Sequence, residues 1–440
     1  MWPRAITILT FVVFSASTDQ VKEVDLSYKG LTKEDFFIKM QSQIRLEEVH
    51  HLILRGNEFD SFLDCSTNLA NLILLDLSQN HLQRFFFLCK DEYNLQILNV
   101  SHNKLEYIDD NAFNDRIPKL KVLDVSSNKL AVVNETMLEH FKDLQYLSLA
   151  NNPIDDGIHE NAFWPLKELK YLDLRNISAS YFAAEYFKTL TKLCALNLSL
   201  NPINTIPSLP TNIEDLDLSG THIAHIHNIS LPKLRELKLN YMYNLRALSL
   251  NDLENLTSLE TLSVVGSKNL VYLRLSNHNS RLLPHLRQLS ISDCALQTLG
   301  NDLMPIIQRT TILNLENNPW NCDCKMQWLN RINTTEDISR EIKCRAPDRH
   351  VNKLLNRIPY YELECDEGQS MFYTALWACI LILVVAITLA VGFLLLKRPL
   401  AQWDIRHRNR DTVSYTNVVE SSNDLVRILA VSETTDRNEE

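Results

Sequence analysis

Four cysteines, Cys322, Cys324, Cys344 and Cys365, lie close together in the last third of the sequence. Cysteines at such spacing either pair as disulfides or hold a zinc ion. Four cysteines allow three pairings, and a bond between Cys322 and Cys324 across one residue is geometrically poor. Disulfides are the expected chemistry for a secreted segment, and a zinc site is the competing interpretation.

Histidines form a second group that could bind a metal. His222, His225 and His227 follow a strand-like segment, and His50 and His51 are adjacent. No carboxylate or cysteine completes a recognisable ligand set with the three histidines. No nucleophile–base pair or phosphate-binding loop is evident in the sequence either. We therefore expect no metal site, no cofactor and no enzymatic activity.

The only tyrosine after residue 396 is Tyr415, and valines flank it at positions 413 and 418. The segment resembles an immune inhibitory motif through both valines, and an SH2-domain adaptor ligand through Tyr415 and Asn417. It also resembles an endocytic sorting signal through Tyr415 and Val418. Phosphorylation would add about two negative charges for an arginine pocket, whereas sorting needs the bare ring. An inert, solvated tyrosine is the remaining interpretation.

Two apolar segments determine where these groups lie. Residues 1–17 combine Arg4, an apolar stretch and a small-residue end, which is typical of a cleavable secretory signal. Residues 371–396 contain no charge and are long enough for a tilted helix to span a lipid bilayer. Lys397 and Arg398 follow at once, so we expect a plasma-membrane protein with an extracellular N-terminus and a cytoplasmic C-terminus.

Most of the remaining chain repeats one pattern. Apolar residues recur at positions one, four, six and eleven, often with asparagine at position nine, and the copies are spaced by 20 to 28 residues. This pattern resembles the leucine-rich repeat, whose period is about 20–29 residues. The thirteen copies begin at Val21, Val49, Leu72, Leu95, Leu120, Leu144, Leu169, Leu193, Ile213, Leu234, Leu259, Leu286 and Thr310.

One copy is a short strand whose fourth and sixth side chains point to the same side, and it cannot bury them alone. Stacked copies share one interior, so the sequence predicts an α/β solenoid, a leucine-rich-repeat horseshoe with a parallel concave sheet. Asparagine at position nine, present in seven copies, should bond backbone groups where the chain turns. The second half has fewer of these asparagines and should be less regular. Phe113 and Phe163 are placed to fill the convex side.

The segment after the last copy resembles the cysteine-rich C-terminal cap of extracellular leucine-rich-repeat proteins with one membrane helix. The residues that carry the resemblance run from Asn318 to Cys324 and continue with Trp328, Leu329, Cys344, Ala346, Pro347 and Cys365. The resemblance implies bonds between Cys322 and Cys344 and between Cys324 and Cys365. The expected order is a signal peptide (1–17), repeats (18–320), a disulfide-bonded cap (318–366), a transmembrane helix (371–396) and a disordered cytoplasmic tail (397–440).

The N-terminal end departs from this family, because many relatives begin with a cysteine cluster and here the first cysteine is Cys65. Cys65 and Cys89 occupy nearly the same place in successive copies, so a bond between them fits if their backbones lie within reach. Two separate thiols are the alternative.

The concave sheet holds the candidate binding residues. Position three reads Leu74, Ile97, Val122, Tyr146 and Tyr171, and position five reads Asp76, Asn99, Asp124, Ser148 and Asp173. Aromatic anchors flanked by charge are typical of a protein-binding patch, although both choices are also common in this repeat class. The candidate ligand-binding residues are Val122, Asp124, Tyr146, Ser148, Tyr171 and Asp173.

Glycosylation sequons limit this face. They occur at Asn99, Asn134, Asn176, Asn197, Asn228, Asn255 and Asn333. Asn99 and Asn197 fall at position five, so glycans there would project from the concave face. If both are occupied, the open window runs from Val122 to Tyr171.

The formal net charge of −10 argues against nucleic acid as a partner. The pattern as a whole predicts a cell-surface receptor or co-receptor that binds an extracellular protein, with Tyr415 for an SH2-domain or sorting adaptor. The alternatives are a cell-adhesion protein or an auxiliary subunit of another membrane protein, each with a largely inert tail.

Overall fold

The computed structural model describes residues 21–40, 44–62, 69–87, 92–108, 116–227, 229–275, 282–331, 342–363 and 367–408. The chain divides into two compact units, Met1–Cys365 and Asp366–Glu440. The expected signal peptide, Cys65, Cys89, Phe113, Cys365 and the tail from residue 409 lie outside the described residues.

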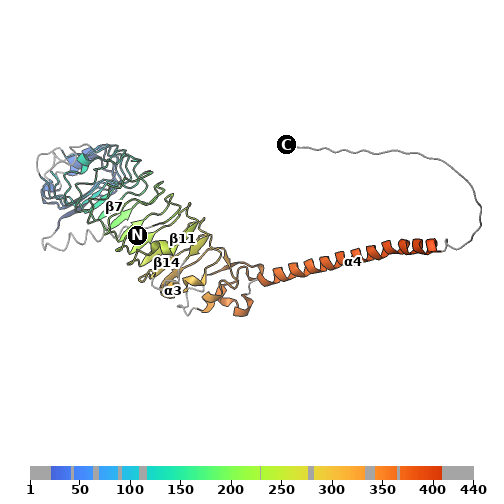
Figure 1. Ribbon diagram of the computed structural model, residues 1–440. Coiled ribbons are helices and arrows are strands. Elements are labelled where there is room, and N and C mark those ends of the chain that lie inside the picture. The colour runs from blue at the N-terminus through green and yellow to red at the C-terminus, as the bar shows by residue number, and fades with distance from the viewer. Residues whose placement is uncertain are drawn as a thin grey trace, which may run out of the picture. The chain divides into compact units, whose positions relative to one another are not determined.

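The first unit is a stack of short parallel strands, which Figure 1 shows side by side from the blue N-terminal turns toward the orange cap. Thirteen strands form one sheet, and each covers positions three to five of one predicted copy, so the predicted parallel solenoid is confirmed. The strands are β1 (Glu23–Asp25), β2 (His51–Ile53), β3 (Leu74–Asp76), β4 (Ile97–Asn99), β5 (Val122–Asp124), β6 (Tyr146–Ser148), β7 (Tyr171–Asp173), β8 (Ala195–Asn197), β9 (Asp215–Asp217), β10 (Glu236–Lys238), β12 (Thr261–Ser263), β14 (Gln288–Ser290) and β15 (Ile312–Asn314).

Two further parallel pairs lie outside this sheet. β11 (Ala247–Ser249) pairs with β13 (Tyr272–Arg274), and β16 (Trp320–Asn321) pairs with β17 (Cys344–Ala346). The other segments contain short helical turns: η1 (Asp35–Met40), η2 (Leu46–Glu48), α2 (Glu135–Leu138), η4 (Leu250–Leu253), η5 (Asn301–Leu303), α3 (Met304–Ile307), η6 (Gln327–Arg331), η8 (Asp348–His350), η9 (Leu355–Arg357) and η10 (Tyr360–Glu362).

The stack is held by one continuous apolar interior. Leu147 and Leu149, at positions four and six, are 0% exposed, and the equivalent residues of every copy after the first are also buried. Burying one such side chain contributes about 1.5–3 kcal/mol, and no copy achieves this burial without its neighbours. Phe163 is also buried in this interior, as predicted.

Asparagines at position nine satisfy the backbone where the chain leaves each strand. Asn152 Nδ2 donates to the carbonyls of Leu149 (2.9 Å) and, one turn earlier, Val125 (3.1 Å). Its Oδ1 accepts from the Leu130 amide at 3.1 Å. Since all these groups are buried away from water, the side chain replaces hydration that the backbone has lost. Equivalent Nδ2 bonds are made by Asn57, Asn80, Asn103, Asn128, Asn201 and Asn318.

Three of the six copies without this asparagine keep part of the ladder with a hydroxyl or a thiol. Thr221 Oγ1 donates to the Leu218 carbonyl at 2.8 Å. Cys294 Sγ donates to the Val264 carbonyl at 3.0 Å. These side chains make fewer bonds than an asparagine does, so the ladder is less regular in the second half, as expected.

The left-handed residue of each turn is at position eight, one residue before the asparagine. Backbone φ is positive at this position in all thirteen copies, although the residue types differ widely. They are Tyr28, Gly56, Gln79, His102, Ser127, Asn151, Asn176, Leu200, Gly220, Tyr241, Gly266, Asp293 and Asn317. The stacking of copies therefore imposes this conformation on side chains that rarely adopt it.

Glycine occupies position eight only in the copy that follows a large side chain. A Cβ on Gly266 would lie 2.5 Å from the ring of Tyr241, and one on Gly220 would lie 2.6 Å from Leu200. The preceding side chain lies flat across the glycine and stays half exposed.

Gly266→Ala is therefore expected to destabilise the protein by ~2 kcal/mol. About half comes from a side chain at positive φ and the rest from displacing the Tyr241 ring. Thermal unfolding of the full chain in detergent would measure the loss. Gly30→Ala is the matched control, because Gly30 has φ +62° but no atom within 4 Å of its added Cβ. Equal losses in the two variants would show that the ring contact contributes nothing.

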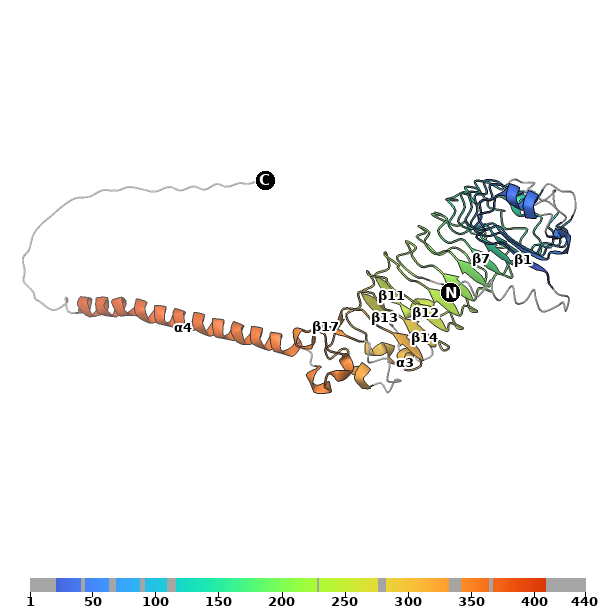
Figure 2. The same cartoon turned by 180° about the vertical axis from the view of Figure 1, so that it is seen from behind.

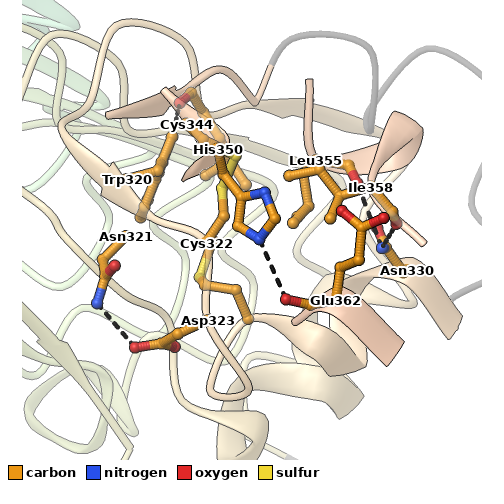
Figure 3. Close-up of a disulfide and its surroundings, with 12 residues drawn as sticks. Trp320, Asn321, Cys322, Asp323, Asn330, Cys344, His350, Leu355, Ile358 and Glu362 are labelled. Carbon is orange, nitrogen blue, oxygen red and sulfur yellow. Dashed lines mark hydrogen bonds between the residues drawn. A yellow bond between two sulfur atoms is a disulfide. The ribbon is translucent and has the colours of Figure 1, made fainter. Parts of the chain in front are cut away.

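The cap closes the C-terminal end of the stack. Trp320 is fully buried, and its Nε1 donates to the Leu315 carbonyl at 2.9 Å. Cys322 is bonded to Cys344, as the resemblance implies. Cys324 is also disulfide-bonded, while its implied partner Cys365 lies outside the described residues. Figure 3 shows His350 beside the Cys322–Cys344 bond.

The described part of the second unit is a single helix, α4 (Glu367–Arg408). Among the described residues, Tyr373–Leu394 is the segment long and apolar enough to cross a membrane. At about 1.5 Å per residue it extends ~33 Å, close to the ~30 Å of a hydrocarbon core. The helix continues through residues 397–408, which the sequence analysis assigned to a disordered tail. Adding a turn to an existing helix costs little, so the loss of apolar residues does not end it.

Candidate functional site

The apolar side chains of position three form a cluster of their own on the concave face. Ile97, Val122 and Tyr146 are buried against one another, and Leu74 and Tyr171 pack at the two ends. Strand register brings them together, because β5, β6 and β7 align their third positions. The structure thus unites the five predicted residues of this stripe.

Access to the stripe differs along its length. Val122 and Tyr146 are only 4–5% exposed, whereas Tyr171 is half-buried. The two tyrosine rings lie 6.5 Å apart, tilted by 38°. Burial, with Asp124 and Asp173 nearby, raises the pKa of Tyr146 above its ordinary value, so its hydroxyl stays protonated. The Tyr171 end is therefore the more accessible end of the stripe.

Position five has a structural role that the sequence analysis missed. The Asp173 carboxylate accepts from the backbone amide of Arg175 at 3.0 Å, and Asp124 accepts from Ser126 at 2.9 Å. The side chain thereby satisfies an amide two residues further on, where the strand ends. Asn99 makes the same bond to Ser101 at 3.0 Å. Asp or Asn followed by serine at this spacing is the signal that could have predicted it.

The carboxylates of the concave face are in an unfavourable environment. Burial, with a contribution from the nearby Asp124, raises the pKa of Asp173 to about 6. The hydrogen bond from the Arg175 amide lowers the pKa but does not offset the burial. Burial also raises the pKa of Asp124. Asp215, at position three of β9, has a pKa raised by burial and by Glu236 on the next strand. Acidic groups therefore continue beyond Tyr171, where the predicted window ended.

Asp173→Asn should remove a pH dependence of stability. A carboxyl whose folded pKa is raised costs stability once it ionises, so the protein loses stability as the pH rises from about 4 through about 6. The asparagine can still accept the Arg175 amide, and residues 173–175 then form no sequon. We expect equal melting temperatures at pH 4 and a variant more stable by ~2 kcal/mol at pH 7.4. A variant that melts below the wild type at pH 7.4 would contradict this cause.

The sequons differ in exposure. Asn197 is 2% exposed, and its Oδ1 accepts from the Ser199 amide at 3.0 Å. Asn134 is the N-cap of α2, with its Oδ1 accepting from the Met137 amide. Asn176 and Asn255 are exposed, Asn99 is half-buried, and Asn228 and Asn333 lie outside the described residues.

The histidines do not converge on one point. The rings of His225 and His227 stack at 5.5 Å, and His227 lies 3.7 Å from the Asp252 carboxylate. Within the described ranges, no three metal-ligating side chains gather into a group. The tail residues Tyr415, Asn417 and Val418 lie outside those ranges.

Comparison with known proteins gives the same architecture. A leucine-rich-repeat family model matches residues 93–154 and 118–176. Mouse vasorin is 29% identical over 192 residues, which is 40% of this chain and 27% of vasorin. The Danio rerio transforming growth factor beta activator LRRC33 is 27% identical, over 62% of this chain and 43% of its own length. Trophoblast glycoprotein of Macaca fascicularis is 26% identical, over 61% and 59%. The chain thus spans between a quarter and three fifths of these relatives.

Solved structures share the fold. A TLR13–ssRNA13 complex superposes with a TM-score of 0.52 at 23% identity, covering 71% of this chain and 53% of that one. A leucine-rich-repeat protein of Leptospira interrogans has a TM-score of 0.52 at 22% identity, covering 71% and 88%. The repeat, the parallel sheet and these matches show that the chain has the leucine-rich-repeat fold with a disulfide-bonded cap and is similar to vasorin and trophoblast glycoprotein, and one of its described helices is long and apolar enough to cross a membrane.

Proposed function

We propose that this protein is a cell-surface receptor or co-receptor that binds a protein ligand on its concave face. The observation that carries the proposal is the Ile97–Val122–Tyr146 cluster, which is separate from the core and continues to the half-buried Tyr171. An apolar and aromatic stripe on an open sheet has no packing role in the solenoid interior. Such stripes bordered by charge are typical of protein-binding surfaces.

The proposed contact surface is wider than the window expected from the sequons. A glycan on the Asn197 amide nitrogen needs space at the surface of the folded chain, and this side chain is only 2% exposed. With Asn197 bare, the surface extends from Val122 past Tyr171 to the carboxylates of Asp215 and Asp217. The ligand should therefore present apolar side chains together with basic ones.

A photo-crosslinking amino acid at Tyr171 tests the site. In the full-length protein on live cells, it should capture an extracellular protein, since Tyr171 lies at the accessible end of the stripe. The same amino acid at Tyr181, which is 57% exposed outside the sheet strands, is the control. Capture at Tyr181 but not at Tyr171 would show that the ligand binds away from the concave face and would contradict the proposed site.

The proposed topology follows from the residues that flank the apolar helix. The signal peptide and repeats enter the secretory pathway, the cap precedes the membrane at the cell surface, and residues after Lys397 are cytoplasmic. An epitope at the C-terminus should be stained only after the plasma membrane is permeabilised. Staining on intact cells would reverse the orientation.

In this proposal Tyr415 recruits an adaptor or directs sorting, and deleting residues 399–440 separates signalling from adhesion. Binding should survive the deletion while the cellular response is lost. If both survive, the protein acts as an adhesion molecule. Tyr415→Phe should abolish SH2-domain recruitment, and Tyr415→Ala should lengthen surface residence if sorting is its role.

A further inference from the structure

A second surface lies beside the concave face, on the segments that follow β9, β10 and β12. Residues 222–231, 243–250 and 268–275 contain three histidines, two arginines and one lysine, and no aspartate or glutamate. The chain as a whole has 54 acidic residues and a net charge of −10. Three neighbouring segments without a carboxylate, of which the second ends just before Asp252 and Glu254, therefore need a local explanation.

Hydrogen bonds join these segments into one surface. Asn244 Nδ2 donates to the carbonyl of His222 at 3.0 Å, and Asn269 Nδ2 donates to that of Tyr243 at 2.6 Å. β11 then pairs with β13, which aligns Ala247 with Tyr272. Figure 2 shows β11 and β13 beside the main-sheet strand β12. The sequence analysis noted the histidines but not this sheet, because its two strands lie in the variable part of the copy.

Aromatic rings on this surface are open to solvent. Tyr241, Tyr243 and Tyr272 are 53%, 58% and 53% exposed. Val271 beside them is 38% exposed. Exposed rings clustered in adjacent turns are the kind of anchor that interfaces use, because they bury much area with few rotatable bonds.

The cations of the surface have no counter-charge. Arg246, Lys268 and Arg274 are exposed, and none of the three forms an ion pair with any residue that the structure describes. By contrast, Arg235 on the neighbouring turn pairs with Glu260 at 2.9 Å. The Arg274 guanidinium lies 4.4 Å above the Tyr272 ring, which holds both groups outward. Two carboxylates border the surface: Asp252 lies 3.7 Å from His227, and Asp302 accepts from the backbone amide of Leu275 at 3.1 Å.

We infer that this surface, which we call the basic flank (His222, His225, His227, Tyr243, Arg246, Lys268, Tyr272 and Arg274), binds an acidic segment of a partner protein. Charge complementarity selects an acidic occupant, and the interleaved tyrosines favour a polypeptide with apolar side chains over a sulfated polysaccharide. The basic flank is separate from the concave stripe and has the opposite charge. One receptor can therefore hold a ligand and an acidic partner at the same time.

Peptide binding to the full-length protein in nanodiscs tests the inference. The probe is a fluorescein-labelled twelve-residue peptide in which glutamate alternates with leucine and tyrosine, followed by anisotropy. The same peptide with lysine for glutamate should not bind. Arg246→Glu with Arg274→Glu should weaken the acidic peptide at least tenfold, and Tyr272→Ala about fivefold without a change in charge. Binding should weaken as the salt concentration rises.

The matched control is Lys343→Glu with Arg345→Glu, two exposed cations of the cap that give the same change in net charge. It should change the affinity less than twofold. An equal loss in both double variants, or no binding by the wild type, would overturn the inference. Tighter binding of a heparin dodecasaccharide than of the peptide would assign the flank to a polysaccharide and overturn it too. Crosslinking at Tyr171 is a separate measurement, so failure here leaves the concave proposal standing.

Discussion

Replacing Asn152 with alanine is expected to destabilise the solenoid by at least ~3 kcal/mol. The side chain is 2% exposed and serves two buried carbonyls, of Val125 and Leu149, and one buried amide, of Leu130. Alanine leaves all three without a partner, and each unsatisfied buried group costs about 1–3 kcal/mol. Neighbouring turns cannot supply substitutes, because Asn128 of the preceding turn is already engaged and the following turn has Ile177 at this position. Denaturant titration of the full chain would measure the loss.

Thr221→Val is the graded control for this prediction. Thr221 occupies the same position of its copy and is equally buried, but Oγ1 gives only one backbone bond, to Leu218. Valine has nearly the same shape, so the expected loss is about 1 kcal/mol. If both variants lose the same stability, the number of ladder bonds does not determine the cost.

Removing the cap disulfide should be comparably damaging. Cys322 and Cys344 are 22 residues apart in sequence, and closing a loop of this size restricts the unfolded chain by ~3 kcal/mol. The bond also holds β17 against β16, which covers the last apolar turn through Trp320. Cys344→Ser should therefore lower the melting temperature and expose the end of the stack. We expect surface expression to fall several-fold, since quality control removes unfolded chains.

Cys294→Ser controls for the loss of a sulfur atom. Cys294 is a free thiol and 7% exposed, and it donates to the Val264 carbonyl. A serine hydroxyl can make this bond, as Ser267 does to Leu239 in the preceding copy. Surface expression should stay within twofold of the wild type. Equal expression of the Cys344 variant would mean that the cap folds without its bond.

The two proposed surfaces carry opposite charge and should bind partners of opposite charge. The concave face gathers carboxylates from Asp124 to Asp217, while the basic flank lacks them. Both depend on side chains that project from the stack and leave its interior unchanged. Substitutions at the exposed positions of either surface should therefore alter binding with little effect on stability, unlike substitutions at the buried Asp173 or Tyr146.

The sequence by itself determined the architecture. Apolar residues at fixed spacing admit one arrangement in which every copy buries its leucines, so the starts of all thirteen strands could be read from positions one, four and six. The stripe from Leu74 to Tyr171 followed from the same register. The apolar helix could also be predicted from the sequence, because a long uncharged segment favours lipid over water by its composition alone. These features depend on local pattern and period.

Only the tertiary structure decided what happens between copies. The left-handed conformation at position eight, and the need for glycine at position 266 against the Tyr241 ring, arise from the stacking of one turn on the next. The raised pKa of Asp173 comes from burial beneath neighbouring strands. The pairing of β11 with β13 depends on two variable segments meeting side by side. Each of these features depends on residues that are more than twenty positions apart in the sequence. Their energies are determined by contacts in space, which the sequence pattern does not encode.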